Sequence, residues 1–354
     1  MTSIGAVTTA AGTGLRVEDY RGSAAEWDAF AEAQRGFTHF HRYGWRRVME
    51  RVHGHECRYL FARDQADALA GVLPLVRVKS VLFGHFLVSM PFLNYGGPLG
   101  TDDAVRALAA RAVALAEGAG ATLLEMRSRV ELPLDLPVSD RKITRVLDLE
   151  PGNPEAAWKA LTSRLRNKIR KAQRAGLAVK FGAEQVGPFF EVFSHHMRDL
   201  GTPTQPRRFF EEIAETFPDD SVFAVGYLWG QPVACGAGFL WGGELEMSWA
   251  SALLAYRDAQ TNVGTYWSVI EYASQRGCRL FNFGRSTPGS GPHQFKQSWG
   301  GRDERLWWYD VSRDGKAVTP SPTDSKYAWG PRLWKRIPVP LATAVGPHIV
   351  RFIP

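Results

Sequence analysis

The residues best suited to chemistry lie in one glycine- and serine-rich stretch, residues 284–296 (GRSTPGSGPHQFK). Turn geometry explains the glycines, but it does not explain why Arg285, His293 and Lys296 follow a predicted strand so closely. Arg285 could clamp an anionic group, or it could form a structural ion pair. Histidine is the commonest general base, so His293 could accept a proton, or it could serve only as a hydrogen-bonding residue of the loop.

The elements before this stretch must position it, and the same series of elements occurs twice in the sequence. In the second half, alternation and turn residues predict strands over 222–229, 233–241 and 244–250, a helix over 262–276 and a strand over 280–284. In the first half, they predict strands over 57–63, 69–78 and 81–90, a helix over 104–117 and a strand over 122–127. Both series end in Arg-Ser, which indicates an internal duplication.

An antiparallel meander, then a helix, then a further strand is the element order of the acetyltransferase fold. We therefore predict an α/β (α+β) protein with two tandem GNAT (acyl-CoA N-acyltransferase)-like domains, each a mixed, mainly antiparallel sheet flanked by helices. A Pro/Gly-rich sequence at residues 151–154 separates the halves. The predicted organisation is a disordered leader over 1–14, an N-terminal domain over 15–150, a C-terminal domain over 151–320, and a tail over 321–354 that packs on the domains.

Composition argues against several other classes of protein. The sequence has three cysteines without CxxC spacing, which predicts neither a disulfide framework nor a zinc site. The adjacent His195 and His196 would point in different directions on a helix, so no metal site is predicted. The uncharged stretches 80–101 and 222–243 contain glycine and proline, unlike a membrane span. We expect a cytoplasmic protein without a transmembrane helix.

Residues 159–174 contain seven lysines and arginines and no acidic residue, which equals the formal net charge of +7 of the whole chain. The apolar residues of this segment have helical spacing and predict a helix that ends at Gly176. Seven cations occupy its other positions: Lys159, Arg164, Arg166, Lys168, Arg170, Lys171 and Arg174. Because like charges destabilise a helix, we expect an anion here, from a nucleotide-linked donor, transfer RNA or an anionic glycan. A basic face that is merely solvated is the alternative.

The basic segment is also where the sequence resembles a known family. Residues 163–177 (SRLRNKIRKAQRAGL) resemble the segment that opens the second half of FemAB-type proteins. The resemblance extends over nearly the whole chain. Residues 71–99, residues 281–301 and the ending from Leu333 are similar to a FemAB-like subgroup found with exosortase and PEP-CTERM exopolysaccharide systems.

The resemblance implies tandem acetyltransferase-like domains and transfer of an acyl or aminoacyl group to an amine. Better-known members use aminoacyl-tRNA, bound by a long helical arm, to modify peptidoglycan precursors. Here the basic segment leads directly into VKFG at Val179, which leaves no room for such an arm. An acyl-CoA or an acyl carrier thioester is therefore at least as well supported a donor as aminoacyl-tRNA.

The functional expectation is an N-acyltransferase that modifies an amine of a cell-envelope or exopolysaccharide precursor. One alternative is an aminoacyl-tRNA-dependent peptidyltransferase that acts on a peptidoglycan precursor. Another is a non-catalytic protein that binds a precursor or a partner. The expected partners are a small-molecule donor, an envelope-glycan precursor, transfer RNA at the basic helix 159–174, and a membrane surface in peripheral proximity.

Donor binding in such a fold needs a strand edge for the thioester and a helix N-terminus for phosphates. Trp249 and Ala250 are predicted on that strand edge. Asn262, Gly264 and Thr265 begin the helix at the position of a pyrophosphate loop, although the second glycine of the acetyl-CoA pattern is missing. An ordinary helix N-cap is the alternative interpretation.

The resemblance also assigns residues to the acceptor side of the site. It places Lys296, within FKQSWGG, beside the acceptor and the transferred carbonyl, where it would stabilise an oxyanion or an acceptor phosphate. Ser286 and Phe295 are predicted neighbours of the substrate. Asn94 and Tyr95 follow a strand of the first half and could contact the acceptor, with core packing as the alternative for Tyr95.

Overall fold

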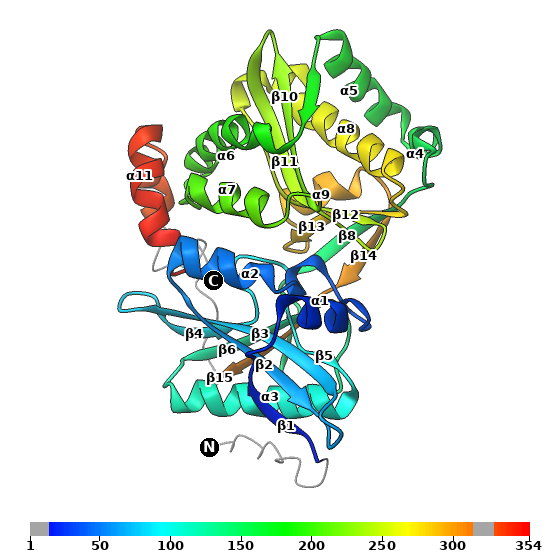
Figure 1. Ribbon diagram of the computed structural model, residues 1–354. Coiled ribbons are helices and arrows are strands. Elements are labelled where there is room, and N and C mark those ends of the chain that lie inside the picture. Colours follow the sequence, from blue (N-terminus) through cyan, green and yellow to red (C-terminus); the bar gives the residue numbers. More distant parts are fainter. Residues whose placement is uncertain (1–13, 314–328) are drawn as a thin grey trace. The chain divides into compact units, whose positions relative to one another are not determined.

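The computed structural model describes residues 14–313 and 329–354, so the predicted leader, apart from Gly14, lies outside the described residues. The chain divides into two compact units (Figure 1). The first unit takes the described residues up to Asp140, the strand that follows Leu306, and Arg351–Pro354. The second takes Arg141–Arg305 and the helices that end at Val350.

The first unit is a mixed sheet with one long helix and a group of short ones. Its strands are β1 (Arg16–Asp19), β2 (Glu56–Arg63), β3 (Leu69–Ser80), β4 (Gly84–Val88), β5 (Leu99–Gly100), β6 (Leu123–Ser128), β7 (Val138–Ser139) and β15 (Trp307–Ser312). Its helices are α1 (Ala24–Glu32), α2 (Gly44–Val48) and α3 (Asp102–Gly118), with short 3-10 and π segments at His39–His41 and Met49–His53. The strand order is β1-β2-β3-β4-β6-β15-β7, and β5 pairs with β3.

The second unit repeats this plan. Its strands are β8 (Ile143–Asp148), β9 (Ala178–Phe181), β10 (Ser221–Leu228), β11 (Gln231–Trp241), β12 (Glu244–Ala252), β13 (Leu280–Ser286) and β14 (Arg302–Arg305). Its helices are α4 (Pro154–Ala160), α5 (Ser163–Arg174), α6 (Val186–Leu200), α7 (Arg207–Thr216), α8 (Thr261–Gln275), α9 (Gly291–Gln297), α10 (Trp329–Trp334) and α11 (Val339–Val350), with 3-10 turns at Ala183–Gln185 and Leu254–Ala259. The strand order is β14-β8-β13-β12-β11-β10-β9.

A helix with an apolar face packs on each sheet at the same place in the repeat. In α3, the buried residues Ala104, Leu108 and Ala112 recur every four positions and join the core of the first unit. In α8, Val263, Trp267 and Ile270 recur at spacings of four and three and join the core of the second unit. These faces are the periodic patterns that predicted the helices, and the predicted fold class of two mixed, mainly antiparallel sheets with flanking helices is confirmed.

Two strands belong to a different unit from the one that the predicted domain ranges give them. β8 precedes the predicted boundary at residues 151–154, yet it pairs with β13 and β14 of the second sheet. β15 lies in the range predicted for the C-terminal domain, yet it pairs with β6 and β7 of the first sheet. The chain therefore passes from the first unit to the second after Asp140 and returns at Leu306.

The basic segment is two helices rather than the one predicted over 159–174. The side chain of Thr162 accepts a hydrogen bond from the amide of Leu165 and caps α5. Arg166 donates to the carbonyls of α4 and its end, including that of Leu161 at 2.6 Å. The guanidinium of Arg170 lies over the Trp158 ring at 5.4 Å. Some of the seven cations therefore have structural partners.

Within residues 14–313 and 329–354, no group of three His, Cys, Asp or Glu side chains is placed to hold a metal ion. No helix in the described ranges is long and apolar enough to cross a membrane. The three cysteines are unpaired and buried, and burial raises the pKa of each thiol, to about 11 for Cys278. This burial argues against a nucleophilic role for any of them.

Candidate active site

The candidate site lies where two parallel strands of the second sheet separate. β12 and β13 pair at three positions, which end with Glu246 opposite Asn282. Beyond that point β12 stays with β11 as far as Ala252, opposite Ala234, while β13 pairs with β8. Among the described residues, the edge of β12 from Ser248 to Ala252 thus has no register partner on the β13 side, so its backbone groups can bind a ligand.

A bulge in β12 coincides with the separation. Met247 lies opposite Gly238 and Trp249 opposite Ala237, so Ser248 is the extra residue. Gly238 permits this close approach, because a Cβ there would lie 1.8 Å from the carbonyl oxygen of Glu246. The bulge changes the direction of β12 just beyond its last contact with β13.

A buried polar cluster occupies the point of separation. The side-chain amide of Asn282 donates to Glu244 Oε1 at 2.9 Å and approaches Glu246 Oε2 at 3.4 Å. Its carbonyl oxygen accepts from Thr144 Oγ1 at 2.6 Å and from the Gly284 amide at 2.8 Å. Glu246 is fully buried, and its Oε1 lies 3.4 Å from the hydroxyl of the half-buried Ser248.

Lys296 of α9 is directed at the end of β13. Its ammonium donates to the carbonyls of Gly284 at 2.8 Å and Arg285 at 2.9 Å. Burial lowers the pKa of Lys296 to about 8, although the charge of Glu246 opposes this shift and that of Arg285 adds to it. Within the described part of the chain its hydrogen bonds go to these two carbonyls, which leaves one of three N–H donors for a ligand.

His293 holds the loop together through both ring nitrogens. Nδ1 accepts from the amide of Gly289 at 3.0 Å, so Nε2 carries the proton and faces Asp303 Oδ2 at 3.0 Å. Asp303 also binds Arg145 at 2.6 Å. Burial opposes ionisation of Asp303, but the hydrogen bonds from Arg145 and His293 outweigh it and hold the pKa of this carboxyl below its usual value. This pairing suits a residue that orients the loop better than one that accepts a substrate proton.

The other residues predicted in this loop have different surroundings. Arg285 is half-buried and lies opposite Thr144 in register. Ser286 is buried, and its hydroxyl has no hydrogen-bond partner among the described residues. The ring of Phe295 packs edge-on against Tyr266 at 5.0 Å in the core, which anchors α9 rather than exposing the ring.

The predicted donor residues lie on β12 and at the start of α8. Trp249 packs edge-on against Phe210 of α7 at 5.4 Å, whereas Ala250 packs on the core that contains α8. α8 begins at Thr261 after Gln260, whose φ of 59° turns the chain into the helix. The first amides of a helix have no partner within it, so they can bind an anion.

Gly264 has a packing role at this helix N-terminus. A Cβ on Gly264 would lie 2.4 Å from Leu177 Cδ2 and 2.8 Å from the Cβ of Ala172. The glycine therefore lets α5 approach α8 closely. Nearby, Thr261 and Thr265 are buried, and their hydroxyls have no hydrogen-bond partner in the described residues. Asn262 is half-buried in the first turn.

Asn94 and Tyr95 belong to the first unit, and each contributes to its interior. The Tyr95 ring is fully buried and stacks on Phe40 at 5.9 Å. The carbonyl oxygen of Asn94 accepts a hydrogen bond from the indole of Trp308 at 3.2 Å. The structure thus brings Arg285, His293 and Lys296 into one cluster in the second unit, while Asn94 and Tyr95 are described within the first.

The equivalent opening in the first unit is filled by the chain itself. β4 and β6 also pair in parallel at three positions, ending with Val88 opposite Glu125. The following loop then returns along β6, with the Gly97 amide 2.7 Å from the carbonyl of Arg127. The buried Arg127 side chain pairs with Glu125 at 2.5 Å and donates to the Leu93 carbonyl at 2.7 Å. Its guanidinium also lies 4.5 Å from the Trp308 ring centre.

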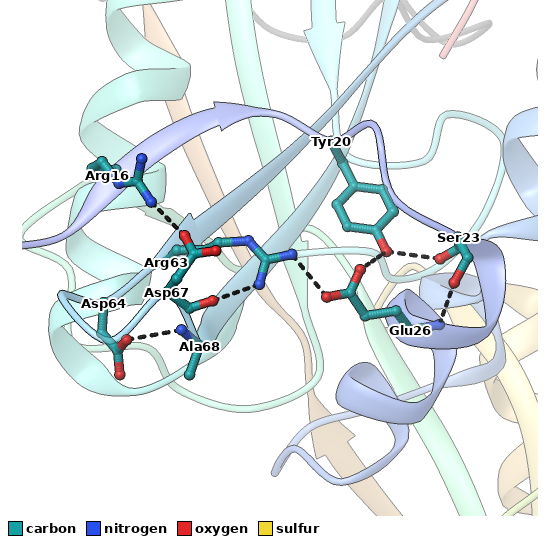
Figure 2. A network of polar contacts seen from close by, with 8 residues as sticks. All are labelled: Arg16, Tyr20, Ser23, Glu26, Arg63, Asp64, Asp67 and Ala68. Atoms are coloured by element: carbon teal, nitrogen blue, oxygen red, sulfur yellow. Dashed lines mark hydrogen bonds and ion pairs between the residues drawn. The ribbon is translucent and has the colours of Figure 1, made fainter.

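A cavity of about 550 Å³ in the first unit has other properties. It lies beside β1, with Tyr20, Arg63 and Arg111 among its lining residues. Figure 2 shows the polar network there: Arg63 donates to Glu26 at 2.8 Å, and the Tyr20 hydroxyl donates to Glu26 at 2.7 Å. These groups bind one another and connect β1, α1 and β2, so we place the candidate site in the second unit.

Four residues of the candidate site were not predicted from sequence: Thr144, Glu244, Glu246 and Asn282. A signal for two of them was present in ELEM, because glutamates two residues apart in a strand lie on the same face. Asn282 was a further signal, because it is a polar residue within the apolar strand predicted over 280–284. Thr144 could not have been found, since β8 reaches this sheet from beyond the predicted domain boundary.

The comparisons with known proteins agree with this geometry. Residues 159–297 match the family model described as "Acetyltransferase (GNAT) domain". This range includes β12, α8, β13 and α9, which carry most of the candidate site. No curated protein matches the chain.

Several solved structures have the same fold. A crystal structure of FemX is 14% identical with a TM-score of 0.63 and covers 84% of this chain and 98% of its own. The C-terminal domain (DUF2156) of a putative lysylphosphatidylglycerol synthetase from Agrobacterium fabrum is 12% identical, with a TM-score of 0.55 and coverage of 82% and 92%. A tandem GNAT protein from the clavulanic acid biosynthesis pathway is 13% identical, with a TM-score of 0.51 and coverage of 86% and 100%. The fold is therefore that of two tandem GNAT-like domains.

Proposed function

We propose that the second unit is an N-acyltransferase that moves an acyl group from a thioester donor, an acyl-CoA or an acyl carrier, to an amine of a cell-envelope or exopolysaccharide precursor. The observation that carries the proposal is the separation of β12 from β13 at Glu246 and Asn282. A strand edge with available backbone groups and a buried carboxylate at its inner end suit a thioester and an amine that attacks it.

The donor would lie along the edge of β12. Trp249 and Ala250 would offer backbone hydrogen bonds to the donor's acyl arm. The amides of α8 around Asn262 would bind its phosphates, because the positive end of the helix dipole attracts anions. The buried hydroxyl of Thr265 would be a further donor-side contact, whereas Gly264 would act by keeping α5 close to α8.

Glu246 is the best-placed general base for this reaction. The amine nitrogen of the acceptor attacks the thioester carbonyl carbon, and a new C–N bond forms as the C–S bond breaks. The proton lost by the amine passes to the Glu246 carboxylate, with the Ser248 hydroxyl as the route between them. The thiolate leaves and takes up a proton from solvent. The products are an amide and a free thiol.

Lys296, Arg285 and His293 would support this step in different ways. The ammonium of Lys296 would stabilise the negative charge that develops on the carbonyl oxygen or on an acceptor phosphate. Arg285, on the strand end that Lys296 holds, would clamp an anionic part of the acceptor. His293 would position the loop through its contacts with Gly289 and Asp303.

The acceptor class rests on the resemblance to FemAB-like proteins of exopolysaccharide systems. The buried hydroxyl of Ser286 at the end of β13 is a candidate hydrogen-bond partner for it. Phe295 would act indirectly, by anchoring the helix that carries Lys296. Asn94 and Tyr95 are buried in the first unit, so the proposed site does not include them.

Aminoacyl-tRNA is the second candidate donor, and the basic α5, packed against α8, is the observation that favours it. Thermal-shift titration with CoA, acetyl-CoA and charged tRNA separates the two, because a ligand that binds the folded state raises the melting temperature. The proposal expects stabilisation by CoA and acetyl-CoA. Stabilisation by charged tRNA alone would move the donor to the aminoacyl class, and a response to none of them would favour a binding protein without turnover.

A further inference from the structure

The helices α10 and α11 carry an unusual combination of charges and apolar side chains. From Trp329 to Pro354 the sequence contains no Asp or Glu. Three cations of this segment, Arg332, Lys335 and Arg336, are exposed. The segment is therefore purely cationic on its solvent side, in contrast to the mixed charges of α7, where Arg208 pairs with Glu215.

Large apolar side chains are exposed among these cations. Leu333 of α10 is 56% exposed, and Leu341 and Val345 of α11 are 53% and 40% exposed. Leu341 and Val345 are four residues apart, so they lie on one face of α11. The packed face lies about 100° around the helix from them, because Ala342 and Gly346, each one residue further along, are buried. The outward face of α11 is thus apolar where a surface helix normally carries charged residues.

Both helices pack against α6, and Figure 1 shows α11 beside it. Leu200, the last residue of α6, is 52% exposed. Its neighbour Gly201 is so close to α10 that a Cβ there would lie 2.6 Å from the carbonyl oxygen of Pro331. We call this surface the α10–α11 patch: Leu200, Leu333, Leu341 and Val345 with Arg332, Lys335 and Arg336.

We infer that the α10–α11 patch binds the surface of a bilayer that contains anionic phospholipid. Exposed apolar side chains gain free energy when they enter the boundary between headgroups and acyl chains. Lysine and arginine beside them are attracted to anionic headgroups, each by roughly 1 kcal/mol near the surface. The helices are 6 and 12 residues long, a length that suits helices lying on a bilayer better than helices crossing it.

The charges favour a bilayer over a second copy of this chain. In a symmetric dimer the same surface meets itself, so Arg332, Lys335 and Arg336 would face their own copies. The segment supplies no carboxylate to balance them. An anionic bilayer supplies both the apolar phase and the opposite charge.

Vesicle flotation tests the inference with the full chain. We expect the protein to bind vesicles of about 70% phosphatidylcholine and 30% phosphatidylglycerol, because roughly a third of anionic lipid gives the vesicle a strong surface potential. We expect little binding to vesicles of phosphatidylcholine alone. The double variant Leu341→Asp/Val345→Asp should reduce the partition coefficient at least about tenfold. The triple variant Arg332→Gln/Lys335→Gln/Arg336→Gln should reduce it by about a hundredfold.

Leu82→Asp is the control, because Leu82 is a leucine of the first unit that is even more exposed, at 83%, and its replacement should leave binding unchanged. Circular dichroism melting checks that each variant is folded, and the triple charge variant removes only exposed groups. Equal binding to both kinds of vesicle, no binding by the wild type, or full binding by the folded triple variant would overturn the inference. Light scattering that shows a dimer abolished by Leu341→Asp would overturn it in favour of self-association.

Discussion

Glu246 and Asn282 form the last register pair between β12 and β13, and the amide nitrogen of Asn282 lies 3.4 Å from Glu246 Oε2. One pair of residues thus ends the strand pairing and fixes a buried carboxylate at the inner end of the open edge. The corresponding pair of the first unit, Val88 and Glu125, ends its strand pairing in the same way, but there Arg127 pairs with Glu125. This difference assigns the proposed chemistry to the second unit.

Replacing Glu246 by Gln should remove the proposed base. We expect kcat to fall by about 10²–10³-fold, with the Kd for CoA nearly unchanged, because the donor binds mainly through backbone groups. His293→Gln is the comparison: it disturbs loop packing but removes no base, so its kcat should fall less than about tenfold. Steady-state kinetics with calorimetric CoA binding distinguishes the two, and a larger loss in His293→Gln than in Glu246→Gln would contradict the assignment.

The lowered pKa of Lys296, to about 8 from a usual value of 10.5, predicts a pH dependence of stability. Below pH 8 the ammonium is charged in both states and contributes no slope. Between about pH 8 and 10.5 the unfolded chain binds more protons than the folded one, so the free energy of unfolding should rise with pH, by up to about 3 kcal/mol. Urea unfolding at pH 7 to 10 should show this rise in the wild type and not in Lys296→Met.

The same titration predicts a limit on activity. Because the charged ammonium is the form that stabilises an oxyanion, kcat should decline above about pH 8 in the wild type. Lys296→Arg, which keeps its charge at alkaline pH, should move that decline upward if it is folded. An unchanged pH profile in this variant would mean that another group sets the limit.

Gly264→Ala tests the packing of α5 on α8. The new methyl would lie 2.4 Å from Leu177 Cδ2, so we expect a loss of about 1–3 kcal/mol in the free energy of unfolding. Adding Leu177→Ala should recover part of it by removing the nearest atoms. Gly118→Ala at the end of α3, where no heavy atom lies within 4 Å, is the control and should be neutral or slightly stabilising. Chemical denaturation of the variants measures these differences.

Arg127→Met tests the filled opening of the first unit. It leaves the fully buried Glu125 without its ion-pair partner, so we expect a loss of about 3–5 kcal/mol. The double variant Glu125→Gln/Arg127→Met removes both charges and should be more stable than Arg127→Met alone. If thermal melting placed the double variant below the single one, the ion pair would not be the main interaction of Arg127 here.

The fold was predictable because its signals are local and occur twice. Hairpins such as β10–β11 are marked by a turn at Gly230, where φ is 79°, between two apolar runs. The pairings of β8 and β15 were not predictable, because they join segments far apart in the sequence and no local pattern records them. The break between α4 and α5 was missed because the apolar spacing continues through Thr162, while its side chain caps the second helix.

The site was predictable only in part for the same reason. The loop around Lys296 was identified from its cations, but the role of His293 depends on Asp303, which comes from β14. Gly264 was taken for a phosphate-loop residue, and only its distance to Leu177 reveals a packing role. Glu246 could be recognised as a candidate base only from the structure, because its carboxylate lies where β12 and β13 separate.

Hydrogen exchange of the full chain with and without saturating CoA tests the central claim most directly, since a ligand bound along a strand edge slows exchange of the amides it covers. We predict slower exchange in Ser248–Ala252 of β12 and in the first turn of α8, with β4 and β6 of the first unit unaffected. Absence of protection in β12, or protection confined to the first unit, would contradict the account.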